Sequence, residues 1–273
     1  MILTDFHIHS KCSCDGYHTM LEMARAARER GVEILCFTDH CDMDNSETGE
    51  PDPNYFNNRD SILEMYRQTL TQKPENMKIF LGLELGEGNH NPEKAALAAA
   101  IPELDFVLGS LHNLKKTPDF YVYPYSSEAE CRLLINRYLD ELIELSKLDF
   151  YDVMAHIGYT VRYMRRKGFD IWVSAEEYPE KIRTLLKCLI ERGKGIEINC
   201  AGFRDKIVGG PIPTIDVLKL YRELGGEIIT VGSDAHKLQH AGVGLKEGFD
   251  ILSDLGYKYV TFFEKRKPSF IKI

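Results

Sequence analysis

The chain has 273 residues, of which 44% are hydrophobic and 28% are charged, a composition typical of a globular protein with one substantial core. Because α/β barrels of this length are often undivided, we expect residues 1–273 to form a single domain. With 34 basic and 42 acidic residues, the net charge is −8. This balance argues against broad binding to nucleic acid or to anionic membranes, both of which favour basic surfaces.

Seven short apolar runs predict strands, and they alternate with segments of helical periodicity. The predicted strands are residues 2–7, 34–38, 78–83, 106–109, 153–155, 195–199 and 227–232, with 258–263 as a candidate for one more. The predicted helices are residues 19–30, 59–70, 92–100, 128–148, 175–191, 214–224 and 244–255. This alternation predicts an α/β fold with a parallel sheet, either open or closed into a barrel.

Two long polar segments, residues 39–58 and 114–127, are predicted loops. Each follows a predicted strand, so both are expected at the same end of the sheet, where α/β folds place their functional sites. The second loop contains Tyr121, Tyr123 and Tyr125, which either cover a pocket or pack the loop itself.

The seven cysteines are odd in number and scattered in spacing. The N-terminal residues lack a basic stretch followed by an apolar core, so no secretory signal is predicted. The apolar run at residues 95–101 is too short to span a bilayer. We therefore expect free thiols and a cytoplasmic location.

Histidines and carboxylates recur at the ends of the predicted strands. His7 and His9 would share one face of the first strand, because residues i and i+2 point the same way. The other members of this set, in chain order, are Asp15, His40, Glu84, His112, His156, Asp234 and His236. In a parallel barrel, the carboxyl ends of the strands converge on one mouth, which would crowd these residues together.

Such a cluster is not a stable core without a cation. Packed carboxylates repel one another, and clustered imidazoles lose hydration without gaining partners. Divalent cations resolve both problems, and neutral imidazole with carboxylate is a ligand set for zinc, manganese or iron. The sequence therefore predicts a metal centre built from the strand ends.

The same residues lie in motifs by which the chain resembles the PHP (polymerase and histidinol phosphatase) family. The motifs are His7-Ile8-His9-Ser10, Ser13-Cys14-Asp15-Gly16, Phe37-Thr38-Asp39-His40, Gly82-Leu83-Glu84, Gly109-Ser110-Leu111-His112, Ala155-His156 and Gly232-Ser233-Asp234-Ala235-His236. The resemblance spans nearly the whole chain. It implies a distorted seven-stranded (β/α) barrel, similar to a TIM barrel, that holds three divalent metal ions.

The resemblance also implies how the ligands are shared among three ions. One ion would be held by His7, His9, Glu84 and Asp234. A second would be held by His112 and His156 with Glu84 as a bridge, and a third by Asp15, His40 and His236. Of these residues, Glu84, Asp234 and His236 are the ones expected to be catalytic.

Two arginines are candidates for binding a phosphate group, because a guanidinium binds phosphate bidentately. Arg162 follows His156, and Arg204 follows the sixth predicted strand. Surface arginines without a role would look the same in the sequence. Arg204 ends a Glu-x-Asn-x-x-Gly-x-Arg segment, with Glu197 and Asn199, that is similar to one in the histidinol-phosphatase branch of the family.

Clustered divalent ions would supply a metal-bound hydroxide and neutralise phosphate charge. The resemblance thus implies a phosphomonoesterase, in particular a histidinol-phosphatase that converts L-histidinol phosphate and water to L-histidinol and phosphate in histidine biosynthesis. Its partner would be a small phosphorylated metabolite.

The sequence leaves two alternative functions. A PHP phosphodiesterase or nucleotidase would favour an open basic groove, and the only basic stretch is the short segment at residues 162–167. A non-catalytic metal-binding module would be expected to lack ligands, and none is missing. The sequence does not choose among zinc, manganese and iron, and it leaves the oligomeric state open.

Overall fold

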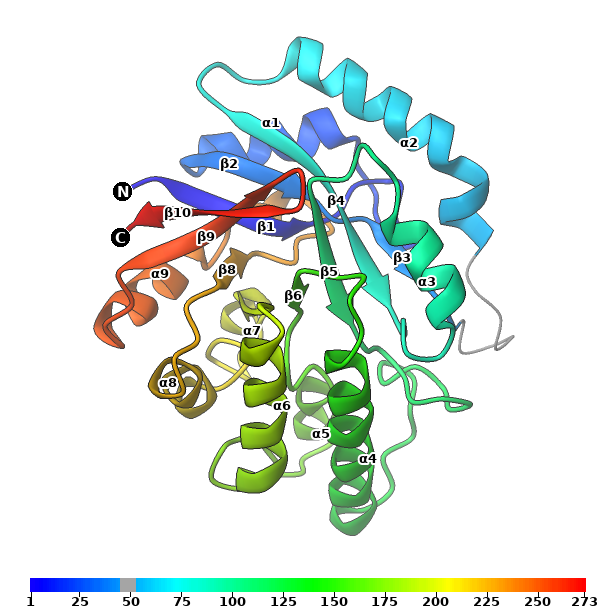
Figure 1. Ribbon diagram of the computed structural model, residues 1–273, viewed down its shortest axis with the longest axis vertical. Helices are drawn as coiled ribbons and strands as arrows, with labels where there is room; N and C mark the ends of the chain where they lie inside the picture. The colour runs from blue at the N-terminus through cyan, green and yellow to red at the C-terminus, as the bar shows by residue number, and fades with distance from the viewer. Residues whose placement is uncertain (45–52) are drawn as a thin grey trace.

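The computed structural model describes residues 1–44 and 53–273, with side chains described for 1–44 and 58–273. Seven parallel strands follow one another around a nearly closed barrel in the order of the chain (Figure 1). They are β1 (Leu3–Ile8), β2 (Val32–Phe37), β4 (Lys78–Gly86), β5 (Phe106–Ser110), β6 (Val153–Met154), β7 (Gly195–Asn199) and β8 (Ile229–Gly232). The predicted seven-stranded α/β barrel is therefore confirmed.

The barrel closes where the segment after β8 meets the end of β1. Ile8 and Ala235 form a parallel bridge, and the His9 backbone N–H donates to the Ala235 carbonyl over 3.0 Å. The Asp234 backbone N–H donates in turn to the His7 carbonyl over 2.6 Å. The first and last histidine-containing motifs of the sequence are thus held side by side by backbone hydrogen bonds.

One short strand was missed in the sequence. Residues 39–58 were predicted to be a loop, but β3 (His40–Asp42) pairs in parallel with Glu84–Gly86 of β4. This is possible because β4 runs beyond the end of β2, which leaves an edge for a second partner. Residues 45–52 of the predicted loop lie outside the described residues, and its last six residues are helical, because α2 (Pro53–Gln72) begins at Pro53.

The long helices lie around the outside of the barrel (Figure 1) and agree with the predicted ranges within a few residues, except that the helix predicted over residues 59–70 begins at Pro53. They are α1 (Met20–Glu29), α2 (Pro53–Gln72), α3 (Pro92–Ala99), α4 (Glu128–Ser146), α6 (Pro179–Glu191), α8 (Ile215–Glu223) and α9 (Leu245–Asp254). Helix α1 begins with a capping box between Thr19 and Glu22. Helix α6 begins at Pro179 rather than at Ala175, because proline is favoured in the first turn and disfavoured further in.

Three short helices were not predicted: α5 (Val161–Arg166), α7 (Ala201–Arg204) and the 3-10 helix η1 (Leu238–His240). Each follows a barrel strand on the side where the predicted metal ligands lie. Elements of three to six residues are too short to display a helical period in sequence.

The interior of the barrel holds an aromatic core distinct from the core beneath the helices. The ring of Phe6 packs edge-on against that of Phe106, with 5.2 Å between their centroids. The candidate eighth strand is real but belongs to a separate antiparallel hairpin of β9 (Tyr259–Glu264) and β10 (Lys267–Lys272). Phe263 of this hairpin contacts Phe106 at a centroid distance of 5.0 Å, so β9 covers the base of the interior core.

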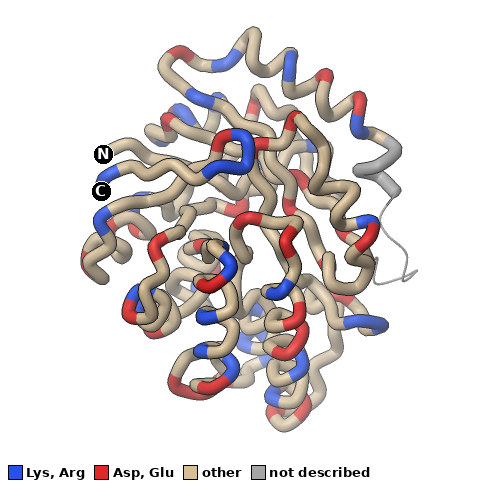
Figure 2. Tube along the Cα trace, in the orientation of Figure 1, with Lys and Arg blue, Asp and Glu red and all other residues tan. Residues whose placement is uncertain are grey.

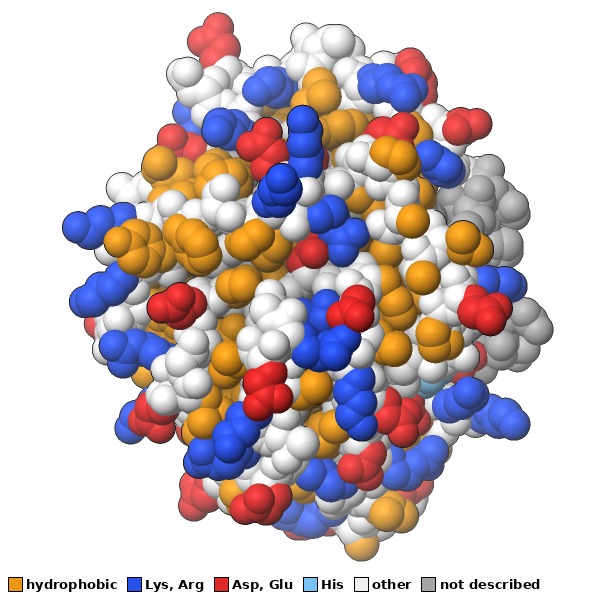
Figure 3. All heavy atoms as spheres, in the orientation of Figure 1, with side chains coloured by type: hydrophobic (Ala, Val, Ile, Leu, Met, Phe, Trp, Pro, Cys, Tyr) orange, Lys and Arg blue, Asp and Glu red, His pale blue; other side chains and the backbone are white. Residues whose placement is uncertain are grey.

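The surface carries charges of both signs. Lys and Arg alternate with Asp and Glu along the helices, and no single-sign stripe is seen in this view (Figure 2). Apolar side chains gather beside the two termini, where the hairpin lies (Figures 1 and 3). Within the described part of the chain, no helix is both long and apolar enough to cross a membrane.

The turn of the hairpin is anchored by Arg266, which has a left-handed φ of 62°. Its Nε donates to Asp152 Oδ2 over 2.6 Å, and its two Nη groups donate to the carbonyls of Ala99 and Phe150. Asp152 Oδ2 also accepts from the Val107 backbone N–H over 2.8 Å. Arg266 thereby ties the hairpin to the segments that lead into β5 and β6.

We expect Arg266→Ala to lower the free energy of unfolding by about 2 kcal/mol, because it leaves the largely buried Asp152 carboxylate without its cation. Urea denaturation followed by circular dichroism measures the change. Arg192→Ala is the control, because the partner of Arg192, Asp149, is 82% exposed and such pairs contribute little. Equal denaturation midpoints for the two variants would contradict the anchoring role of Arg266.

Candidate metal centre

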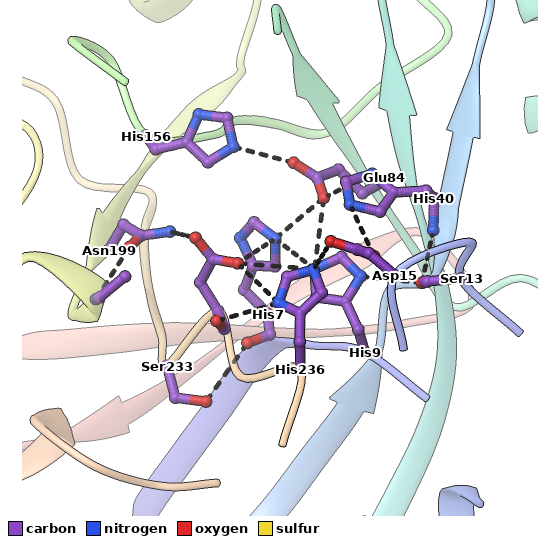
Figure 4. Close-up of polar contacts among 12 residues, drawn as sticks. His7, His9, Ser13, Asp15, His40, Glu84, His156, Asn199, Ser233 and His236 are labelled. Carbon is purple, nitrogen blue, oxygen red and sulfur yellow. Dashed lines mark hydrogen bonds and ion pairs between the residues drawn. The ribbon is translucent and has the colours of Figure 1, made fainter. Parts of the chain in front are cut away.

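The structure brings the nine predicted ligand residues to one end of the barrel, around a cavity of about 1000 Å³. His7 and His9 are fully buried, while seven of the residues line the cavity: Asp15, His40, Glu84, His112, His156, Asp234 and His236. Figure 4 shows the imidazoles of His7, His9 and His236 grouped together, with Glu84 and His156 on the opposite side. The convergence expected from the strand ends is therefore present.

The first group consists of His7, His9, Glu84 and Asp234. The Nε2 atoms of His7 and His9 lie 3.1 Å apart, and they lie 3.1 and 3.4 Å from Glu84 Oε2. Asp234 Oδ1 lies 3.8 Å from the His7 nitrogen and 3.6 Å from the His9 nitrogen. Two ligands bound tetrahedrally to one zinc ion are about 3.3 Å apart, so these atoms have the spacing of a shared cation site.

Glu84 joins this group to a second one. Its Oε1 lies 3.2 Å from His112 Nε2 and 2.9 Å from His156 Nε2, on the other side of the carboxylate from His7. The side chain is only 1% exposed. Burial alone would raise the pKa of Glu84, but the imidazoles of His7, His40 and His112 outweigh it and hold that pKa well below its usual value.

The third group lies at the more open side of the cavity. His236 Nε2 is 3.0 Å from Asp15 Oδ2, and His40 Nε2 is 3.8 Å from Asp15 Oδ1. The ring of His9 stacks on His236 with 3.9 Å between centroids, and ring nitrogens of His9, His40 and His236 lie close enough to share one ion. His9 is therefore positioned between the first and third groups.

Two of the histidines have a partner that fixes which ring nitrogen faces the cluster. His7 Nδ1 is 2.7 Å from Glu197 Oε1, and His9 Nδ1 is 3.0 Å from Ser13 Oγ. A proton on each Nδ1 leaves the Nε2 lone pair directed at the shared centre, the arrangement seen in carboxylate–histidine–metal triads. For His9, burial and the neighbouring rings of His236 and His40 hold the pKa well below its usual value, which favours the neutral, ligating form.

The buried polar atoms of this cluster are not all satisfied by the protein. Among the described side chains, His156 Nδ1 is buried without a hydrogen-bond partner, while His40 Nδ1 and His236 Nε2 face only carboxylate oxygens of the same cluster, at 3.2 and 3.0 Å. Buried polar groups in folded proteins are rarely left in this state. The donor set, the spacing and the unpaired His156 nitrogen together fit divalent cations.

Two of the predicted ligand residues have unusual backbone geometry. His156 has a φ of 20° and Asp234 a φ of 51°, in a region that non-glycine residues seldom adopt. A strained residue of this kind costs on the order of 1–3 kcal/mol and persists where its surroundings enforce it. Here Glu197 Oε2 accepts from the His156 backbone N–H over 2.9 Å, and the Asp234 N–H is held by His7.

Three acidic residues of the site were not predicted as part of it. Asp42 and Glu87 lie beside His112 and could hold a cation with it, and Glu197 contacts His7 and His156. Glu197 stood out in the sequence only through the segment that ends at Arg204. Asp42 and Glu87 gave no comparable signal, because they lie on β3, which was missed, and just after β4, which is longer than predicted.

Both predicted arginines reach the cavity, from the two short helices α5 and α7. Arg162 is largely buried, yet its Nε and one Nη group have no hydrogen-bond partner among the described residues. Its guanidinium lies 5.0 Å from the ring centroid of Tyr159 and 3.8 Å from Asp234 Oδ2. Two donors of Arg204 are already used within the protein, because its Nη groups donate to the carbonyls of Ser233 and Asp234 over 2.5 and 2.9 Å.

Comparison with known proteins places this barrel among relatives of the same length. The probable histidinol-phosphatase of Clostridium acetobutylicum is 29% identical over 262 residues, which cover 96% of this chain and 97% of that protein. The histidinol-phosphatase of Lactococcus lactis subsp. lactis is 24% identical over 274 residues, covering 96% of this chain and 95% of that one.

The fold is also shared with a solved structure. Histidinol phosphate phosphatase from Lactococcus lactis subsp. lactis, complexed with zinc, L-histidinol and phosphate, superposes with a TM-score of 0.74 at 23% identity, covering 98% of each chain. The family model of the PHP domain matches residues 5–201, more than two thirds of the sequence. The chain belongs to the PHP domain family.

Proposed function

We propose that this protein is a metal-dependent phosphomonoesterase that hydrolyses L-histidinol phosphate to L-histidinol and inorganic phosphate. The observation that carries the proposal is the convergence of three imidazole–carboxylate groups near Glu84, in the same cavity as Arg162 and Arg204. The relatives named as histidinol-phosphatases cover nearly the whole chain and support this substrate.

The residues that would hold the ions are those of the three groups. We assign His7, His9, Glu84 and Asp234 to one ion, Glu84, His112 and His156 to a second, and Asp15, His40 and His236 to a third. Zinc, manganese or iron would suit these ligands. When bound, the ions supply a water of lowered pKa and neutralise the charge of the phosphate oxygens.

The protein's own groups orient the ester. Among the described residues, Arg162 Nε and Nη2 make no hydrogen bond, although Nη2 lies 3.8 Å from Asp234 Oδ2, and we assign these donors to the phosphate oxygens. Arg204 would add to this contact while it holds the carbonyls of Ser233 and Asp234 in place. Asp234 faces the metal ligands with Oδ1, while its Oδ2 accepts from Asn199 and lies near Arg162. We infer that Asp234 holds the proposed metal ligands and the proposed phosphate-binding arginine in a fixed relative position.

The proposal is tested by phosphate release from purified protein loaded with zinc or manganese. We expect release from L-histidinol phosphate in preference to nucleotides and to phosphodiesters. No release from any phosphomonoester by metal-loaded protein would contradict it. Preferential cleavage of oligonucleotides would instead favour a PHP phosphodiesterase.

Metal binding is expected to stabilise the fold, because ligands that bind only the native state shift the unfolding equilibrium. Removal of an ion present at a hundred times its dissociation constant should lower the free energy of unfolding by about 3 kcal/mol. Denaturation of wild-type protein with and without a chelator measures this. Glu84→Gln should abolish most of the difference, whereas Glu223→Gln on the exposed face of α8 should retain it. A full metal-dependent shift in Glu84→Gln would contradict the shared role of Glu84.

Two of the three arginines of α5, Arg162 and Arg165, offer a matched test of phosphate binding. Arg162→Ala should lower kcat/KM by about 100-fold or more, the cost of losing one donor to a developing oxyanion, while the bound metal measured by elemental analysis stays the same. Arg165 faces away from the site, with its guanidinium 4.1 Å from the Trp172 ring. Arg165→Ala should therefore leave kcat/KM near the wild-type value, and equal losses in the two variants would argue against the phosphate contact.

Glu197 connects ligands from two strands, so its loss should weaken metal binding although it does not itself face the centre. We expect Glu197→Ala to reduce metal affinity about 10- to 100-fold, as measured for partners of ligating histidines. Glu197→Gln retains one acceptor oxygen, which can serve His7 Nδ1–H or the His156 N–H but not both, and should have a smaller effect. Titration with a chromophoric chelator compares the variants. Unchanged affinity in a folded Glu197→Ala protein would show that the contact is dispensable.

A further inference from the structure

One acidic residue of the cavity has no role in the arrangement described above. Asp119 lies in the segment between β5 and α4 and lines the same cavity as the metal ligands and the two arginines. The other described carboxylates that line this cavity either lie among the histidines or, like Asp205, pair with an arginine. Asp205 is 2.8 Å from Arg166.

Among the described residues, only one oxygen of the Asp119 carboxylate accepts a hydrogen bond. Its Oδ1 accepts from the Tyr121 backbone N–H over 2.6 Å, which closes an Asx turn. Among the described residues, its Oδ2 accepts no hydrogen bond, and no lysine, arginine or histidine forms an ion pair with Asp119. Burial raises the pKa of this carboxyl, and the nearby His112 imidazole only partly opposes the rise.

Aromatic rings connect the metal ligands to this carboxylate. Tyr159 packs against His156 and His112 with centroid distances of 4.9 and 5.2 Å. Tyr163 follows at 5.3 Å from Tyr159, and Tyr121, two residues beyond Asp119, lies 5.8 Å from Tyr163. The cavity is thus bordered by a continuous aromatic wall that begins at the metal ligands and ends at the Asx turn.

Hydrogen bonds fix the position of Asp119 relative to the metal ligands. The Phe120 backbone N–H donates to the His112 carbonyl over 2.9 Å, and the Tyr125 hydroxyl donates to the Phe120 carbonyl over 2.7 Å. The Val122 N–H donates to the Asp119 carbonyl over 3.0 Å. The carboxylate is therefore a fixed feature of the wall, and it directs negative charge into a cavity whose arginines supply positive charge.

We propose that Asp119 and the aromatic wall formed by Tyr121, Tyr159 and Tyr163 make a subsite for a cationic amine on the alcohol portion of the phosphoester. The inference rests on the proposed function and deepens it, because it assigns the residue that selects amino-alcohol phosphates over neutral ones. A carboxylate supplies a charged hydrogen-bond acceptor, and neighbouring aromatic faces attract an ammonium group. The phosphate and the amine of one substrate would then be held by opposite charges within one cavity.

The test compares two esters and two alcohols: L-histidinol phosphate and L-histidinol, and for each the analogue in which hydrogen replaces the ammonium group. Asp119→Asn removes the charge but retains an oxygen that accepts from the Tyr121 N–H, so the turn is preserved. We expect kcat/KM of the metal-loaded variant to fall about 10- to 100-fold for the amino ester and to stay near wild type for the deaminated ester. Asp205→Asn, which removes an already paired carboxylate, should leave the ratio between the two esters unchanged.

Calorimetric titration with the two alcohols measures the subsite without turnover. Wild-type protein should bind L-histidinol at least about tenfold more tightly than its deaminated analogue, and Asp119→Asn should lose this preference. Equal losses on both esters, or equal binding of both alcohols by the wild-type protein, would overturn the inference. Failure to hydrolyse either ester would contradict the proposed function alone, because the alcohol titrations still decide whether the subsite exists.

Discussion

The site depends on one buried carboxylate. Glu84 lies at the centre of a group of imidazoles, with Oε2 near His7 and His9 and Oε1 near His112 and His156. A carboxylate removed from water is costly unless it is paired, so the surrounding strands must deliver partners to it. They come from β1, β5 and β6 and from the segments beside them, and the parallel direction of the strands places all of them at one end of the barrel. The parallel barrel thus supplies the partners that offset the free-energy cost of burying the Glu84 carboxylate.

A second layer of contacts keeps these partners in position. Glu197 on β7 accepts from the backbone of His156 and lies against His7, and Asn199 on the same strand donates to Asp234. The backbone hydrogen bonds between β1 and the segment after β8 hold Asp234 beside His7 in a conformation that an isolated residue would avoid. The energy to hold this strain comes from many ordinary contacts elsewhere in the barrel.

The cavity beside these contacts has positive and negative side chains on different segments of its wall. Arg162 and Arg204 supply positive charge from two short helices that follow β6 and β7, whereas Asp119 supplies negative charge from the segment that follows β5. The rings of Tyr159 and Tyr163 lie between the histidines and that segment. We propose that a substrate with an anionic and a cationic group would be oriented by this separation of charge, with its phosphate directed at the metal ligands.

The sequence by itself determined the strand–helix alternation, the parallel sheet and the set of histidines and carboxylates at the strand ends. These follow from short-range patterns: apolar runs, glycine and proline at the ends of helices, and ligand residues at fixed places in each run. The tertiary structure alone decided the rest. The strand β3 forms because β4 extends beyond the end of β2 and leaves an unpaired edge. The hairpin of β9 and β10 lies outside the barrel sheet and covers its aromatic interior. The contacts of Glu197 and Asp42 with the histidines, and the position of Asp119 in the same cavity, likewise depend on how segments that are remote in sequence lie in space, and no periodic pattern in the sequence records this.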